Sequence, residues 1–241
     1  MAFRLRRRMI MRWHVWLGWL VGVPLLLWTA SGLFMASWPI DTIRGEHLKA
    51  QSASLPAFVP VPPVLAGRKV MTMTLAQQAG GPVWMIDYAD GGKRRADART
   101  GALLPALSAR QAEAIARAAY AGPSTLTGIS RFSAQDAPLE LRRPRPSWQA
   151  RFGDDTHVYI DAETGAVLAT RSGLWRVFDF MWGLHIMDLQ TRENTSHPIL
   201  IGFAALAVVS ILIGIVLLPL RRAKGRSTPQ GLEPGRISKN G

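Results

Sequence analysis

Two long uncharged stretches decide the fold of this chain: residues 13–40, WHVWLGWLVGVPLLLWTASGLFMASWPI, and residues 198–220, PILIGFAALAVVSILIGIVLLPL. They contain 28 and 23 residues, and neither has an Asp, Glu, Lys or Arg. A helix of about 20 apolar residues crosses the hydrocarbon core of a bilayer, so each stretch is long enough to span a membrane. The sequence therefore predicts two transmembrane helices with residues 41–197 between them.

Basic residues are concentrated just beyond these stretches. Residues 1–12 carry five arginines and no acid, and residues 221–241 carry six basic residues and one acid, so each tail has a charge of +5. The loop between the helices has 18 basic and 15 acidic residues, or +3. This distribution of the net charge of +13 argues against nucleic-acid binding and follows the positive-inside rule. We expect a bacterial inner-membrane protein with both termini in the cytoplasm and residues 41–197 in the periplasm.

A cleaved signal peptide is the alternative for the first stretch, because arginines precede it and Ala36-Ser37 is a weak cleavage site. The apolar part of a signal peptide is only about 7–15 residues long, so the length of residues 13–40 favours an uncleaved helix. The chain has no cysteine, which excludes disulfides, thiolate metal sites and iron–sulfur clusters built from its own residues.

The loop contains an internal repeat with an offset of 64 residues. PVWMIDYADGGKRRADARTGALL at 82–104 aligns without a gap with PSWQARFGDDTHVYIDAETGAVL at 146–168, and nine of 23 positions are identical. The most similar part is Asp97-Ala-Arg-Thr-Gly-Ala against Asp161-Ala-Glu-Thr-Gly-Ala. This pattern is typical of a turn, because Asp bonds nearby backbone and Gly adopts positive φ. Such self-similarity indicates a repeated supersecondary unit.

Each copy has the pattern of a β-meander. Alternating large side chains and turn residues predict strands near 69–76, 82–89 and 93–98, and again near 147–152, 156–160 and 166–170. Ser108 and Gln111 have the spacing of a capping box, which predicts a helix from there to Gly122-Pro123. We therefore predict an α+β fold, in which two transmembrane helices bracket an extracytoplasmic, duplicated helix-plus-antiparallel-β-meander domain. The helix of the first copy is expected to be weak or missing.

The segment before the second apolar stretch is predicted to be an amphipathic helix. Trp175, Phe178, Trp182 and Leu189 recur at helical spacing, and His185 falls on the same face. We expect this helix to lie in the outer interface of the bilayer, with its aromatic residues among the headgroups.

These features divide the chain into eight segments: a cytoplasmic basic tail (1–12), transmembrane helix 1 (13–40), a linker (41–68), the first half of the duplicated domain (69–107), the second half (108–173), a juxtamembrane amphipathic helix (174–197), transmembrane helix 2 (198–220) and a disordered cytoplasmic tail (221–241). The linker contains a run of prolines, and the last tail is polar with glycine and proline.

Several motifs resemble those of a known family. The segment Trp148-Gln-Ala-Arg-Phe, followed by Thr156-His-Val-Tyr-Ile-Asp-Ala-Glu-Thr-Gly-Ala-Val-Leu, resembles a PepSY domain. The run Trp175-Arg-Val-Phe-Asp-Phe-Met-Trp-Gly-Leu-His-Ile-Met-Asp is similar to the juxtamembrane motif of PepSY-associated transmembrane proteins. Arg12-Trp-His-Val-Trp-Leu-Gly and Ser31-Gly-Leu are similar to the first helix of that family, so the resemblance covers about residues 10–220.

The resemblance implies two kinds of function. Some relatives are larger inner-membrane proteins of four helices that are linked to ferric-siderophore reduction, with haem held by membrane histidines. Other PepSY modules occur in protease propeptides, where they inhibit the enzyme. This chain departs from the redox relatives because it has two predicted spans and no flavin or nucleotide domain.

The resemblance makes haem b the cofactor to test, with His14, His185 and His197 as candidate ligands. A b-type haem commonly takes two histidines at one membrane depth. His14 and His197 lie at opposite ends of the predicted spans, about 30 Å apart across the bilayer. Two arrangements stay open: His14 pairs with a histidine of a partner chain, or His47, His185 and His197 form a site on the outer side. The alternative for each histidine is a structural role, and His157 is expected on the surface of a strand.

Two functions therefore stay open. The first is an accessory of membrane electron transfer in iron or siderophore handling, with His14 and His185 helping to hold a haem, across a homodimer packed through Gly18 and Gly22 or with a partner reductase. The second is a membrane-anchored periplasmic binding or regulatory module that acts on a partner protein such as a protease. The chain has no G-x-S-x-G, H-E-x-x-H or P-loop motif, so we expect no enzyme activity of its own. The basic segment 142–145 and the acids of the turns are expected to be solvated.

Overall fold

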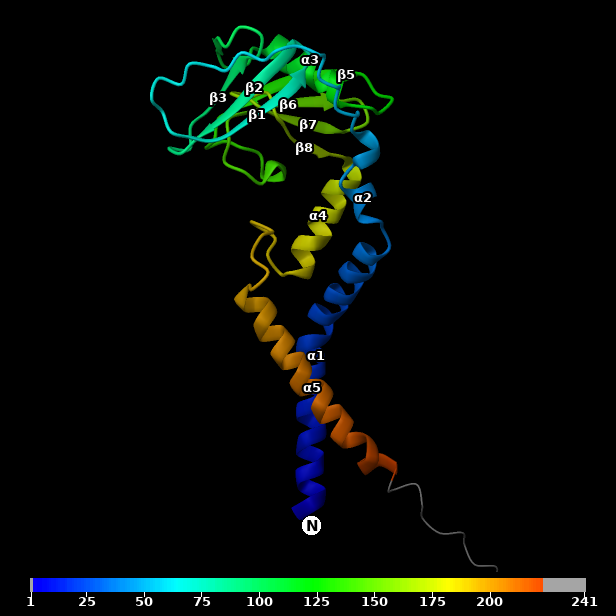
Figure 1. The fold of residues 1–241 in the computed structure, drawn as a ribbon. Coiled ribbons are helices and arrows are strands. Elements are labelled where there is room, and N and C mark those ends of the chain that lie inside the picture. The colour runs from blue at the N-terminus through cyan, green and yellow to red at the C-terminus, as the bar shows by residue number, and fades with distance from the viewer. Residues whose placement is uncertain (1, 223–241) are drawn as a thin grey trace, which may run out of the picture.

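Two long helices and a β-rich domain make up the molecule (Figure 1). The computed structural model describes residues 2–222, and the side chains of residues 8–218. The predicted disordered tail lies outside the described residues from position 223 onward. Helix α1 comprises Ala2–Ala36 and helix α5 comprises Pro198–Arg222.

Both helices are long and apolar enough to cross a membrane, over Arg8–Ala36 and Pro198–Leu218. Only 11% and 6% of the residues in their most apolar windows are buried in the molecule, so these are not core helices of a globular domain. The two predicted spans are therefore confirmed as outward-facing apolar helices, which is what contact with lipid requires.

Helices α1 and α5 cross each other below the domain (Figure 1). The contact uses small residues, as helix pairs in membranes often do. Ser210 on α5 is buried, and a Cβ added at Gly214 would lie 3.2 Å from Cε1 of His14 on α1. In contrast, a Cβ at Gly18 or Gly22 would meet no described atom within 4 Å. The small face around Gly18 and Gly22 is thus not used for packing against the described residues.

The domain contains two antiparallel sheets of four strands each. The first has the order β1 (Val70–Gln78), β2 (Gly81–Tyr88), β3 (Lys93–Asp97) and β4 (Leu103–Leu104), and the second has β5 (Leu126–Phe132), β6 (Ser147–Phe152), β7 (His157–Asp161) and β8 (Val167–Arg171). The identical order confirms the duplicated antiparallel architecture. Strand β5 was not predicted, because Gly128 and a shift in pairing at Leu126/Gly128 interrupt its alternation.

The repeated turn has the same hydrogen bonds in both copies. Asp97 Oδ1 accepts from the backbone N–H groups two and three residues later, at 2.7 and 3.1 Å, and Asp161 Oδ1 does the same at 2.9 Å for both. Gly101 and Gly165 follow with φ values of +75° and +73°, which only glycine adopts at little cost. The local pattern that revealed the repeat is therefore the one that builds the turn.

The two sheets are covered by different elements held in the same way. In the second copy the Trp148 indole N–H donates to Leu107 O (3.2 Å), and Leu107 N–H donates to Ala162 O (2.7 Å). Leu107 leads directly into helix α3, Ala109–Ala119, which begins with the predicted Ser108 capping box. Residues Ala112, Ile115 and Ala116 of this helix pack with Ala150, Val158 and Ile160 of the sheet.

In the first copy the covering element is a proline-rich segment instead of a helix. The Trp84 indole N–H donates to Val61 O (2.8 Å), and Val61 N–H donates to Ala98 O (2.8 Å). Trp84 and Ala98 are the repeat equivalents of Trp148 and Ala162. The next residues are two prolines, which cannot donate the backbone hydrogen bonds of a helix. Part of the predicted linker, 41–68, therefore lies on the first sheet, with Leu65 in its small core.

Two short elements connect α1 to the domain, and a third lies within the domain. After α1 come α2 (Ile40–Ile43) and the 3₁₀ helix η1 (Glu46–Leu48), and another 3₁₀ helix, η2 (Leu139–Leu141), precedes β6. Helix α4, Gly173–His185, starts two residues after β8 with Ser172 as N-cap and runs beside the outer part of α1 (Figure 1). The helix expected at 174–197 thus ends at His185. The side chains of Trp175, Phe178 and Trp182 line a cavity against α1 and α2, and their expected place among the headgroups stays a prediction.

The duplication supplies a matched stability test in Asp161→Ala and Asp97→Ala. Asp161 is buried and ion-paired with Arg145, whereas Asp97 is half-buried with hydrogen bonds to its own turn. We expect Asp161→Ala to lower the free energy of unfolding by about 3 kcal/mol, because it leaves Arg145 without its partner, and Asp97→Ala by about 1 kcal/mol. Urea unfolding of the full chain in detergent measures both, and equal losses would show that the ion pair contributes nothing.

Candidate functional site

His14 lies on α1 and points at α5. Its ring rests on Gly214, and its Nδ1 is buried without a hydrogen-bond partner among the described residues. A buried ring nitrogen without a partner costs free energy unless something else satisfies it. His14 is therefore part of the contact between α1 and α5, in the N-terminal half of α1.

His185 is the last residue of α4 and is bound to α1. Its Nδ1 lies 3.1 Å from the carbonyl oxygen of Trp28 and 3.2 Å from Ser31 Oγ, and its ring stacks on the Trp28 indole with centroids 4.8 Å apart. Gly32 leaves the space for this ring, since a Cβ there would lie 3.1 Å from His185 Cε1. Because a carbonyl only accepts, Nδ1 carries the proton in the tautomer that this geometry assigns, and Nε2 has the free lone pair.

The other histidines have separate positions. His197 Nδ1 accepts from Ile199 N–H at 3.4 Å, as a residue at the start of a helix does, and His47 is exposed on η1. The side chain of His157 is only 17% exposed and binds Glu140, so the expectation of a surface position for His157 was wrong. In residues 2–222 no three His, Cys, Asp or Glu side chains are grouped as a metal site requires.

The histidines of one chain do not fit a bis-histidine haem between His14 and His185. Ser31, which His185 contacts, is 17 residues from His14 on the same helix, or about 25 Å at 1.5 Å per residue. Two axial ligands of one iron must instead lie on opposite faces of a single porphyrin. The two cavities described below also have no histidine in their linings.

The carboxylate of Glu140 on η2, whose side chain is only 14% exposed, connects three elements. It accepts hydrogen bonds from His157 Nδ1 and from the Tyr159 hydroxyl, both at 2.5 Å and both on β7, and from Arg176 Nη1 of α4 at 3.2 Å. Burial alone would raise the pKa of Glu140, but the hydrogen bonds from His157 and Tyr159 outweigh burial and lower the pKa to about 2. Burial and the bond to Glu140 raise the pKa of Tyr159. Glu140 is therefore ionised, and Tyr159 protonated, at any physiological pH.

A second ion-pair cluster lies farther along α4, at Asp179. Arg142, two residues after Glu140, donates to one oxygen of this buried carboxylate, and Arg192 donates to the other at 2.6 Å. Arg142 and Arg145 therefore form ion pairs, and the expectation that residues 142–145 are solvated was wrong for both. Asp188 holds the following loop, accepting from the N–H groups of Thr191 and Asn194 at 3.0 and 3.2 Å.

Helix α4 thus has fixed partners at both ends. Its first half is bound to residues 140–142 of the domain by Arg176 and Asp179, and its last residue, His185, is bound to α1. Sequence reasoning found His185 but missed Glu140. The one signal in the sequence was a lone acid close to three arginines, which does not reveal that the acid is buried.

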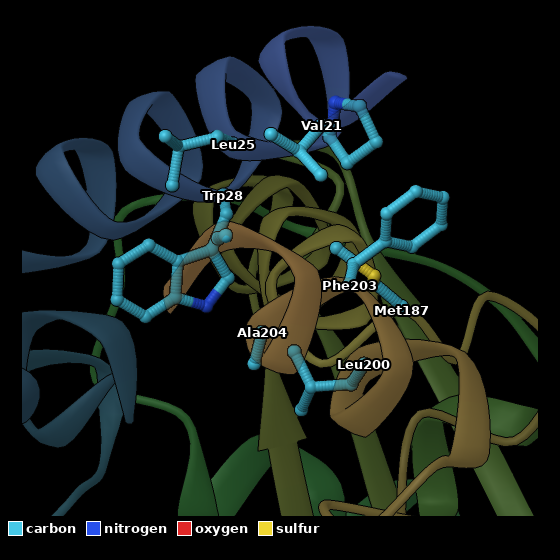
Figure 2. A pocket seen from close by; sticks show the side chains of 9 residues that line it. Val21, Leu25, Trp28, Met187, Leu200, Phe203 and Ala204 are labelled. Carbon is cyan, nitrogen blue, oxygen red and sulfur yellow. The ribbon is translucent and has the colours of Figure 1, made fainter. Parts of the chain in front are cut away.

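Two cavities lie beside helix α1, one facing α5 and the other facing α4. The first is an apolar space of about 190 Å³ between α1 and α5, where Val21, Leu25, Trp28, Leu200 and Phe203 point toward one another (Figure 2). The second, of about 640 Å³, lies between α4 and the segment that joins α1 to α2. The first takes only apolar groups, whereas the second has charged residues in its lining.

The Glu140 network predicts a specific loss of stability in acid. The pKa of Glu140 lies below its ordinary value near 4.5, so its contribution is complete above pH 4.5 and disappears as the pH falls toward about 2. The difference in unfolding free energy between wild type and Glu140→Gln should shrink by up to about 3 kcal/mol over that interval. Fluorescence-detected unfolding at several pH values measures it. Glu113→Gln, in an exposed pair with Arg117, is the control and should show no such change.

The comparison with known proteins gives one clear result. The chain matches the family described as the PepSY-associated TM region over residues 11–237, which includes most of α1, the whole domain and α5. No curated protein and no solved structure gives a significant match. Since the match covers more than nine-tenths of the sequence, the chain belongs to the family of PepSY-associated transmembrane proteins.

Proposed function

We propose that this membrane PepSY protein is a binding and regulatory module, in which the domain outside the membrane binds a partner protein and the contact is transmitted to the membrane helices through α4. The observation that carries the proposal is the attachment of α4 at both ends. A domain that is merely tethered needs only a flexible linker. Here the ion pairs of Arg176 and Asp179 and the His185 contact to α1 fix the intervening helix.

The distribution of charge supports the orientation in this proposal. Both tails carry +5, and the loop that contains the domain carries +3, so the positive-inside rule favours cytoplasmic tails and a periplasmic domain. A partner of the domain would then be a periplasmic protein or the outer part of another membrane protein.

Exposed apolar side chains supply a candidate partner surface. Val59 and Val64 in the proline-rich segment are 88% and 81% exposed, and Met71 on β1 is 69% exposed. Strand β1 is also an edge strand, since β2 is its one neighbour in the sheet. Edge strands and exposed apolar side chains are features on which extended segments of other proteins bind.

Cross-linking in the native membrane tests this function. A photoreactive amino acid at Val64 or at Met71 of the full chain should give an adduct with the same partner, and one at Arg110, exposed on α3, should not. The adduct should persist in His14→Ala, because binding by the domain needs no membrane ligand. Absence of adducts at both positions, or their loss in His14→Ala, would contradict the proposal.

A second candidate is an accessory of electron transfer in iron or siderophore handling, with a haem b held between His14 and a histidine of a partner chain. The uncovered small face of α1 next to His14 is the observation that favours it. His14, Gly18 and Gly22 are spaced by four residues and share a face of α1, and no described atom covers the two glycines. A second copy or a partner reductase can approach along this face.

An absorption spectrum tests the second candidate. Protein purified from haem-replete cells should show a Soret band that sharpens on dithionite addition, with α and β bands. His14→Ala should remove these bands, and His47→Ala, at an exposed position on η1, should leave them unchanged. A spectrum that contains only tryptophan absorption in the near ultraviolet would exclude a haem in the isolated protein.

A further inference from the structure

The cavity beside α4 has an apolar side and a cationic side. Met35 of α1 and Ile43 of α2 face Trp175, Phe178 and Trp182 of α4 across it, and its volume is about 640 Å³. These residues form an apolar wall on which hydrocarbon can pack. Aromatic rings of this kind are common at membrane interfaces.

The cationic side consists of Arg44, which follows α2, and Arg171, at the end of β8. Arg171 Nε donates to Glu140 O at 2.8 Å, and its guanidinium lies 4.2 Å from the centre of the Trp175 ring. Neither arginine forms an ion pair with an Asp or Glu in the part of the chain that the structure describes. Both therefore have guanidinium N–H groups available for an anion.

The one acid in the lining does not neutralise this charge. Asp179 has both of its oxygens bound to arginines outside the lining, Arg142 and Arg192. The cavity is therefore electropositive, with two free cations and an acid that is already paired. Arg171 is half-buried, and burial lowers the pKa of its guanidinium although the charges of Glu140 and Asp179 act in the opposite direction. Anions bind more strongly to guanidinium groups in such surroundings.

The cavity lies at the level where the apolar part of α1 ends. Helix α1 ends at Ala36, Met35 and Ala36 belong to the lining, and Trp38 follows immediately. When α1 spans a bilayer, this level coincides with the lipid headgroups on the side of the domain. A ligand there has hydrocarbon on one side and water on the other.

We propose that this cavity binds an anionic phospholipid, with Arg44 and Arg171 at the phosphate and with Trp175, Phe178 and Trp182 against the glycerol and the first methylene groups. The site is separate from the candidate partner surface and from His14, so it stands independently of both functions proposed above.

Native mass spectrometry of the full chain in mild detergent tests the site. Dioleoylphosphatidylglycerol should bind as one retained molecule, about tenfold more tightly than dioleoylphosphatidylcholine. Arg44→Gln should weaken that binding about tenfold, as expected for loss of one charge-assisted hydrogen bond, and Arg44→Gln/Arg171→Gln should weaken it further. The matched control Arg99→Gln/Arg110→Gln removes the same charge from exposed positions outside the cavity and should bind like wild type.

Several outcomes would overturn the proposal. Equal binding of the two lipids would indicate an apolar groove, and full competition by glycerol 3-phosphate or inorganic phosphate at equal concentration would indicate a site for free anions. If Arg44→Gln binds dioleoylphosphatidylglycerol as tightly as the control variant does, Arg44 does not contact the lipid. Arg44 forms no hydrogen bond through its side chain in the described structure, so this variant should keep the fold, and Arg44→Lys should recover part of the binding.

Discussion

The ionised carboxylate of Glu140 is the interaction on which the arrangement of this molecule depends. A buried carboxylate is stable only when its charge is balanced and its oxygens are hydrogen-bonded. His157, Tyr159 and Arg176 meet that requirement from β7 and from α4, which are different parts of the chain. His157 and Tyr159 offset most of the cost of burying the charge, and Arg176 adds a contribution that exists only when α4 is seated on the domain.

The parts of the fold that could be predicted depend on local patterns. Hydrophobic length identified the two membrane helices, and the spacing of Asp and Gly identified the turns that repeat after 64 residues. The capping box at Ser108 and Gln111 located the start of α3. Each of these signals is read along the sequence itself, so no knowledge of tertiary structure was needed.

The parts that could not be predicted depend on distant residues. Glu140 and Arg176 are 36 positions apart, and Ser31 and His185 are 154 apart. Nothing in the neighbourhood of Glu140 shows that it is buried, and nothing near the prolines of the first copy shows that they cover a sheet. His185 was identified as a candidate residue from a family motif, but its partner on α1 became apparent only from the packing of α4.

The connections to the membrane helices are unevenly shared between the two copies of the domain. The strand-like segment after η1 pairs with the end of α3, through Ala50 N–H to Ala119 O and Ala121 N–H to Leu48 O, and Leu48 belongs to the core of the second copy. Helix α4 leaves the domain from β8, which also belongs to the second copy. Both connections to the membrane therefore converge on one half of the duplicated domain. A tilt or rotation of the helices therefore acts directly on the second copy, whereas the first copy is joined to the helices through the proline-rich segment and the second copy.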